Sequence, residues 1–195
     1  ILTDIPLLTF LILSSYFLFE TFFCQNSEKK IFVSSILFGI FLALAFFTRY
    51  TVLWFFPVLL VWFIYKNKNL RFLSNKFIWL SVAAFSAIVA PWFIFNFLNF
   101  HSLLGFLQNS AQASIRWGSK SVLFYLFSFF RSFWFLIPTL IISFVFYKQI
   151  KFNKHKKIFF VFWFFIVFII ASLTPAKEDR YLYLILPALC ILSSL

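Results

Sequence analysis

The sequence predicts an all-α fold, a polytopic bundle of transmembrane helices. Of its 195 residues, 64% are hydrophobic and 11% are charged, whereas an ordinary soluble domain carries about 25% charged residues. Several apolar runs reach the roughly 20 residues that a helix needs to cross a bilayer. A soluble fold of this length could not bury so much Phe, Leu and Ile, so we expect lipid around it.

The apolar runs predict about seven spans within a single transmembrane domain over residues 1–195. The chain begins at Ile1, contains no Met and stops inside an apolar run, so we interpret it as an internal fragment of a longer protein. The predicted spans are Ile5–Phe23, Ile31–Phe47, Thr51–Tyr65, Phe77–Leu98, Ser121–Tyr147, Ile158–Thr174 and Tyr181–Leu195.

The stretch Ile31–Tyr65 is predicted to cross the membrane twice. A single helix of this length would measure about 52 Å, whereas the hydrocarbon core is about 30 Å thick. The polar residues Thr48-Arg49-Tyr50 interrupt the stretch at its centre. Two short spans joined by a tight turn therefore fit better than one long tilted helix.

Loop charges predict which side each loop occupies. The loops 66–76 and 148–157 contain nine basic residues and no acid, which is typical of cytoplasmic loops. With two spans in 31–65, the segment 25–30 lies on the same side of the membrane as these two loops. Eleven of the 17 basic residues are then on the cytoplasmic side. The outer side then carries Asp4, Arg49, the extracytoplasmic loop 99–120 and the loop 175–180. The expected location is the plasma membrane of a prokaryote.

Composition also argues against two classes of function. The net charge of +12 would suggest nucleic acid for a soluble protein, but here the basic residues lie in loops, where they set topology and meet anionic lipid. Cys24 and Cys190 lie far apart, and no Cys/His cluster accompanies them. The sequence therefore identifies no cofactor, no metal ligands and no nucleic-acid partner. A divalent metal is left open, although this fragment does not support one.

Two ionisable residues near predicted helix ends are candidates for a site. Asp4 precedes Pro6 at the start of the first span. It is either a helix N-cap or a carboxylate that serves as a base or as the partner of a basic residue. Arg49, in the turn between two spans, is either a snorkelling surface residue or a contact for an anion, because a guanidinium matches phosphate with paired donors.

The segment Lys177-Glu178-Asp179-Arg180-Tyr181 is the densest charged stretch. It is either a solvated loop or a binding segment, and Arg180 and Tyr181 stand directly at the start of an apolar span. Lys177 and Arg180 together would bind a phosphate at the membrane surface. Arg131 leaves two alternatives open, since either the first part of its run is an interfacial helix or the side chain faces the bundle interior.

Cations and a carboxylate are thus predicted at one membrane face, beside apolar helices. This arrangement suits an amphiphile with its tail in lipid and a phosphate at the surface, such as a lipid-phosphate sugar donor. Sugar transfer needs a carboxylate that deprotonates the acceptor and cations that stabilise the departing phosphate.

Four segments resemble the protein-mannosyltransferase-like and aminoarabinose-transferase-like membrane glycosyltransferases. Thr3-Asp4-Ile5-Pro6-Leu7-Leu8 resembles their T-D-x-P-L-L helix start. The segment Gly39–Thr51 is similar to their G-L-A-x-L-T-K-Y-T, with Arg49 in place of the usual Lys. Ala90-Pro91-Trp92, followed by Asn96, resembles P-W-x-x-x-N. The segment from Lys177 to Pro187 is similar to K-x-x-R-Y-L-x-x-x-x-P.

The resemblance covers nearly the whole chain and implies a GT-C type fold, a polyprenyl-phosphate sugar donor and an extracytoplasmic active site. It implies that Arg49, Lys177, Arg180 and Tyr181 bind substrate and that Asp4 supports catalysis. In that family the main catalytic Asp precedes the T-D-x-P helix, so we expect the fragment alone to be inactive. The sugar and the acceptor are left open.

Two other functions are weighed against this one. A transporter or lipid flippase would place substrate groups near the bilayer midplane, where Arg131 is the one candidate in this sequence. A non-catalytic membrane scaffold would tolerate charge removal at Asp4 and Arg180. The position of the charges at the outer helix ends favours the glycosyltransferase.

Overall fold

The computed structural model describes residues 4–23, 27–67, 70–101, 123–134, 154–174 and 179–194, and these are helical apart from short connections. Within these ranges, five helical segments are long and apolar enough to cross a membrane: Asp4–Phe23, Glu28–Thr48, Tyr50–Asn67, Lys76–Asn99 and His155–Leu173. The predicted all-α, polytopic membrane fold is therefore confirmed. The chain divides into two compact units, described separately below.

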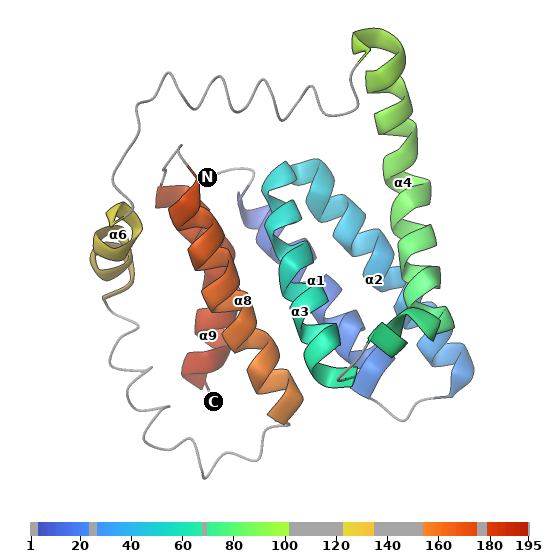
Figure 1. Ribbon diagram of the computed structural model, residues 1–195, viewed down its shortest axis with the longest axis horizontal. Coiled ribbons are helices and arrows are strands. Elements are labelled where there is room, and N and C mark those ends of the chain that lie inside the picture. The colour runs from blue at the N-terminus through green and yellow to red at the C-terminus, as the bar shows by residue number, and fades with distance from the viewer. Residues whose placement is uncertain are drawn as a thin grey trace. The chain divides into compact units, whose positions relative to one another are not determined.

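Unit 1 comprises residues 1–52 and 69–118 and contains three long helices, α1 (Asp4–Phe23), α2 (Glu28–Thr48) and α4 (Lys76–Phe100). Helix α2 packs against both of the others (Figure 1). The short 3-10 helix η2 (Leu70–Ser74) precedes α4, which begins after the N-cap Asn75, whose side chain accepts a hydrogen bond from the backbone of Phe77 at 2.9 Å.

Helices α2 and α4 run parallel. Their first residues, Glu28 and Lys76, form an ion pair, and the hydroxyl of Ser81 donates to the carbonyl of Ser35 at 2.9 Å. Farther along, the rings of Phe46 and Trp92 lie 5.7 Å apart. Because the two helices start at the same end, the chain between Thr48 and Lys76 must return to that end. The two predicted spans within 31–65 are therefore confirmed.

Small residues bring α2 and α4 close together. A Cβ atom at Gly39 would lie 3.0 Å from the Cβ of Ala84 and would overlap the backbone carbonyl oxygen of Ser81. Glycine, alanine and serine at such positions let helix backbones approach in lipid, where packing rather than water exclusion drives association. The resembled segment that begins at Gly39 is thus also the segment that holds α4 against α2.

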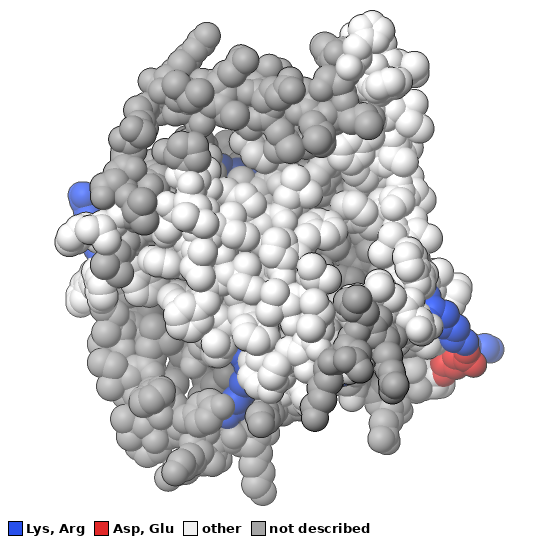
Figure 2. Space-filling view, viewed as in Figure 1, with Lys and Arg blue, Asp and Glu red and all other residues white. Residues whose placement is uncertain are grey.

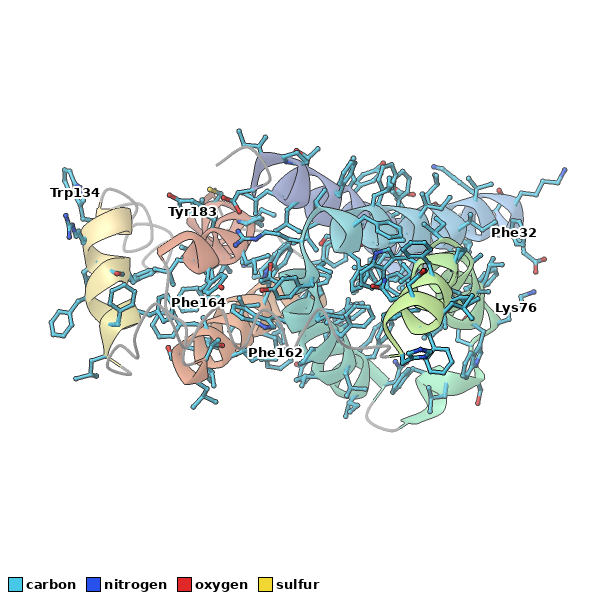
Figure 3. All side chains as sticks on the ribbon, turned by 90° about the horizontal axis from the view of Figure 1, so that it is seen from above. Phe32, Lys76, Trp134, Phe162, Phe164 and Tyr183 are labelled. Atoms are coloured by element: carbon cyan, nitrogen blue, oxygen red, sulfur yellow. The ribbon has the colours of Figure 1, made fainter. Side chains whose placement is uncertain are left out.

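The Glu28–Lys76 ion pair marks the end of unit 1 where α2 and α4 begin. The space-filling view shows it as adjoining red and blue atoms at the right (Figure 2). Figure 3 shows Phe32 and Lys76 at this same end, on α2 and α4. An uncharged middle with charged ends is what a bilayer requires of helices that cross it.

Unit 2 comprises residues 53–68 and 119–195. It contains α3 (Phe55–Asn67), α6 (Phe124–Phe133), α8 (Lys154–Leu173), the 3-10 helix η4 (Asp179–Ile185) and α9 (Leu186–Ser194). Helix α8 packs against α3, α6, η4 and α9. Its aromatic rings divide between neighbours: Phe164 lies on the side of α6 and Phe162 on the side of α3 (Figure 3).

Two buried tryptophans join the elements of unit 2. The indole nitrogen of Trp62 in α3 donates to the carbonyl of His155 at 3.1 Å, and that of Trp163 in α8 donates to the carbonyl of Leu184 at 2.9 Å. Both side chains are fully buried. Each bond satisfies a polar group that would otherwise be buried without a partner.

The last predicted span, Tyr181–Leu195, begins as a 3-10 helix and not as an α-helix. Residues Asp179–Ile185 form a 3-10 helix, and the α-helix begins only at Leu186. Pro187 is consistent with this, because proline has no N–H for an intrahelical bond and is favoured in the first turn of an α-helix. The same pattern occurs before α3, where the 3-10 helix η1 (Tyr50–Trp54) precedes an α-helix with Pro57 in its first turn.

The predicted span Ser121–Tyr147 is described only over 123–134. Helix α6 has ten residues there, about 15 Å in length, and the rest of the predicted span lies outside the described residues. Arg131, Phe127 and Phe130 of α6 are exposed, as is Trp134 directly after it. The two alternatives for Arg131 stay predictions.

Candidate functional site

The first and second resembled segments meet in an ion pair between Asp4 and Arg49. Asp4 is the first residue of α1, and Arg49 directly follows the last residue of α2. The Nη1 group of Arg49 donates a hydrogen bond to Oδ1 of Asp4. The Asp4 side chain is 7% exposed and the Arg49 side chain is 14% exposed. Two residues that are 45 positions apart in sequence thus form one largely buried charged group.

Local chain geometry places the Arg49 side chain. The hydroxyl of Thr48 bonds back to the carbonyl of Ala45 at 2.6 Å, and the backbone N–H of Arg49 bonds to the same oxygen at 3.1 Å. Arg49 then adopts an extended backbone, with φ −160° and ψ 128°, and ends the helix. The following residues form η1, so Arg49 stands at the break between two helical segments.

The ion pair has two chemical consequences. A carboxylate this deeply buried is stable when its charge is paired, and removing one partner of such a pair leaves an uncompensated buried charge. The pair therefore fixes the start of α1 against the end of α2. The carboxylate also holds the guanidinium of Arg49 in one orientation. A guanidinium fixed in this way has its N–H donors already positioned to bind an anion such as a carboxylate or a phosphate.

Of the sequence-predicted site residues, Tyr181 lies in unit 2. Its side chain is 9% exposed, and its ring meets that of Trp54 edge to face at 5.2 Å between centroids. Trp54 is the last residue of η1, five positions after Arg49. The backbone of Arg180 belongs to η4, whereas its side chain and all of Lys177 lie outside the described residues.

Sequence reasoning missed Thr51, which belongs to the same resembled segment as Arg49. Thr51 is 2% exposed, and within the described residues its hydroxyl oxygen has no hydrogen-bond partner. Buried hydroxyls are normally paired. Its position within the resembled T-R-Y-T stretch was the available signal.

The described residues offer no ready metal site. No group of three or more His, Cys, Asp or Glu side chains is placed together in this part of the chain. The chemistry available at the Asp4–Arg49 end is electrostatic: a fixed cation, its carboxylate partner and buried aromatic surface nearby in sequence.

Comparison with known proteins identifies one family. The family model described as dolichyl-phosphate-mannose-protein mannosyltransferase matches residues 1–106. This range is more than half of the 195 residues, and it includes Asp4, Arg49 and the Gly39 packing site. No curated protein and no solved structure matches the chain significantly.

Proposed function

Because the chain belongs to the dolichyl-phosphate-mannose-protein mannosyltransferase family, we propose that its protein transfers a sugar from a polyprenyl-phosphate donor at the extracytoplasmic face of a prokaryotic plasma membrane. The family is one of integral membrane glycosyltransferases and implies a lipid-phosphate-mannose donor and a protein acceptor. The single observation that carries the proposal is the buried Asp4–Arg49 ion pair, which joins two of the resembled segments.

In this proposal, Lys177 and Arg180 bind the donor phosphate, and Arg49 is the substrate-binding cation of its own segment. Arginine and lysine stabilise the negative charge that develops as the phosphate departs. One observation supports the assignment of Arg180: the residue after it, Tyr181, packs against Trp54 at the end of η1. The packing of Tyr181 against Trp54 would then hold the segment that contains Arg180 in place.

Asp4 has a supporting role in the same proposal. Its carboxylate is ion-paired and nearly buried, so it is better suited to orient Arg49 than to accept a proton from the acceptor. Of the two roles expected from the sequence, a base or the partner of a cation, the geometry favours the second. In this proposal, Asp4 is therefore a positioning residue for Arg49.

A transporter is less well supported. Its substrate groups are expected near the bilayer midplane, often on broken helices. Arg131, the sequence-based candidate for such a position, is exposed on a short helix. The ion pairs of the described residues join helix ends instead: Asp4 with Arg49, Glu20 with Lys30, and Glu28 with Lys76.

The test is an assay of donor use by the full-length protein. The purified enzyme is given radiolabelled polyprenyl-phosphate mannose and an acceptor protein, and label transfer is measured for the wild type, Arg180→Ala and Arg180→Lys. We expect Arg180→Ala to reduce transfer by about 100-fold or more and Arg180→Lys to retain part of it. Arg131→Ala is the matched control, with activity near wild type. Normal donor KM and turnover in Arg180→Ala would refute the phosphate site.

A further inference from the structure

We propose that Thr51 is a further substrate-binding residue, whose hydroxyl donates a hydrogen bond to an oxygen of the anionic substrate group that Arg49 binds. The assignment rests on the proposed function, because it takes Arg49 as a substrate-binding cation and a polyprenyl-phosphate sugar as the donor. The anionic group of such a donor is its phosphate. Thr51 adds an uncharged donor beside the guanidinium.

The hydroxyl of Thr51 is buried, and the fold does not use it. Thr51 is 2% exposed, and its hydroxyl oxygen has no hydrogen-bond partner among the residues that the structure describes. An unpaired buried hydroxyl is destabilising, and most buried hydroxyls are paired. A ligand that the hydroxyl binds is one explanation for such an exception.

The break after α2 explains why Thr51 lacks a partner within the chain described. Elsewhere in unit 1, serine and threonine hydroxyls bond to a backbone carbonyl one helical turn back, as do those of Thr9, Ser15, Thr21, Ser35, Thr48 and Ser81. Such a bond needs a continuous helix behind the residue. The extended backbone of Arg49 ends α2 two residues before Thr51, so the usual acceptor is not presented to its hydroxyl.

Burial places Thr51 on the same side of the chain as Arg49. Both side chains are largely buried, whereas Tyr50 between them is exposed. The two polar side chains therefore turn toward the interior of unit 1, and Tyr50 turns outward. Asp4 holds the guanidinium of Arg49 at this position. A guanidinium and a hydroxyl that face the same way can donate to two oxygens of one phosphate.

A hydroxyl suits this position chemically. Burial of a neutral hydroxyl costs much less than burial of a second cation, and a hydrogen bond to a charged phosphate oxygen is stronger than one between neutral groups. The hydroxyl and the methyl group of threonine share one Cβ atom, so rotation of the side chain exchanges them with little change in shape. Because the hydroxyl is closed to water in this structure, we expect such a rotation, or a small shift of η1, when substrate binds.

The experiment uses the full-length protein in detergent, with polyprenyl-phosphate mannose as donor and a protein acceptor. Thr51→Val removes the hydroxyl and keeps the shape, whereas Thr51→Ser keeps the hydroxyl. We expect Thr51→Val to raise the donor KM about tenfold or more, with kcat and the acceptor KM within about threefold of wild type. Thr51→Ser should keep the donor KM within about threefold of wild type.

Ser14→Ala is the matched control. Ser14 is also fully buried, and its hydroxyl likewise has no partner within the described part of the chain. It lies ten residues after Asp4 in α1, about 15 Å along the helix, so its loss should change the donor KM by no more than about twofold. An unchanged donor KM in Thr51→Val, or an equal rise in Ser14→Ala, would overturn the role of Thr51.

The wild type separates this proposal from the proposed function. If the wild type transfers no mannose, the proposed function is refuted, and retention of polyprenyl phosphate in native mass spectrometry then tests Thr51 directly. Weaker retention by Thr51→Val than by wild type and Ser14→Ala would support its role as a phosphate ligand. Equal retention by all three proteins, or none by the wild type, would overturn it.

Discussion

The carboxylate of Asp4, at the first residue of α1, pairs with the guanidinium of Arg49, which directly follows the last residue of α2. The two residues close a hairpin of two long apolar helices at one end. At the other end, Lys30 of α2 lies 3.8 Å from Glu20 of α1, with the lysine largely exposed. A buried and an exposed ion pair thus join the same two helices, and they should contribute very differently to stability.

Removal of the Asp4 carboxylate should destabilise the fold. Asp4→Ala leaves the Arg49 charge buried without its partner, so we expect the free energy of unfolding to fall by about 3–5 kcal/mol. Chemical denaturation of the purified protein in detergent measures this change. The double variant Asp4→Ala/Arg49→Leu should recover most of it. Glu20→Ala, which breaks the more exposed pair, is the control and should cost about 1 kcal/mol or less.

A side chain at Gly39 should separate α2 from α4. Gly39→Leu places atoms where the carbonyl of Ser81 and the Cβ of Ala84 already lie, and overpacking of this kind costs about 1–3 kcal/mol. The readout is Tm in detergent, with the neighbouring Ile40→Val as control. A Gly39→Leu protein as stable as Ile40→Val would show that the two helices do not approach as closely as described.

Replacement of Trp163 by Phe removes one buried donor. The carbonyl of Leu184 loses the 2.9 Å bond from the indole, and an unsatisfied buried carbonyl costs about 1–3 kcal/mol. Trp79→Phe is a matched control, since Trp79 is exposed and its bond goes to the carbonyl of Leu73 near the surface. Differential scanning fluorimetry should give a lower Tm for Trp163→Phe than for Trp79→Phe.

Thr51→Val should not destabilise the ligand-free protein. The Thr51 hydroxyl bonds to no group within the described residues, and valine has the same shape, so loss of the buried hydroxyl is expected to be neutral or stabilising by about 1 kcal/mol. Val52→Thr is the reverse control. It introduces a hydroxyl at the adjacent buried residue and should lower Tm. A lower Tm in Thr51→Val would mean that the hydroxyl has a partner.

Much of the fold could be predicted from apolar length and loop charge. The break at Thr48–Tyr50 was predicted from the basic loops on either side, and the parallel packing of α2 and α4 confirms it. The 3-10 segments were not predicted, although Pro57 and Pro187 show where an α-helix can begin. In these two stretches, the proline position locates the start of the α-helix better than hydropathy does, because hydropathy is uniform across them.

The site was predicted less completely. Asp4 was expected either to cap a helix or to serve as a base or as the partner of a cation. Sequence alone could not select Arg49, because the pairing depends on how α1 packs against α2. The close approach at Gly39 likewise depends on Ser81 from a helix that starts far along the chain. The roles of Arg49, Lys177, Arg180 and Tyr181 in substrate binding stay predictions.

The central claim is sugar transfer on the extracytoplasmic face, and the most direct measurement uses sealed right-side-out membrane vesicles that contain the full-length protein. Polyprenyl-phosphate mannose with a radiolabelled sugar is incorporated into the membrane, and a membrane-impermeant acceptor peptide is added outside. The account predicts that the outside peptide becomes labelled before any detergent is added. Labelling that appears only after the vesicles are permeabilised would place the active site on the cytoplasmic face and contradict the account.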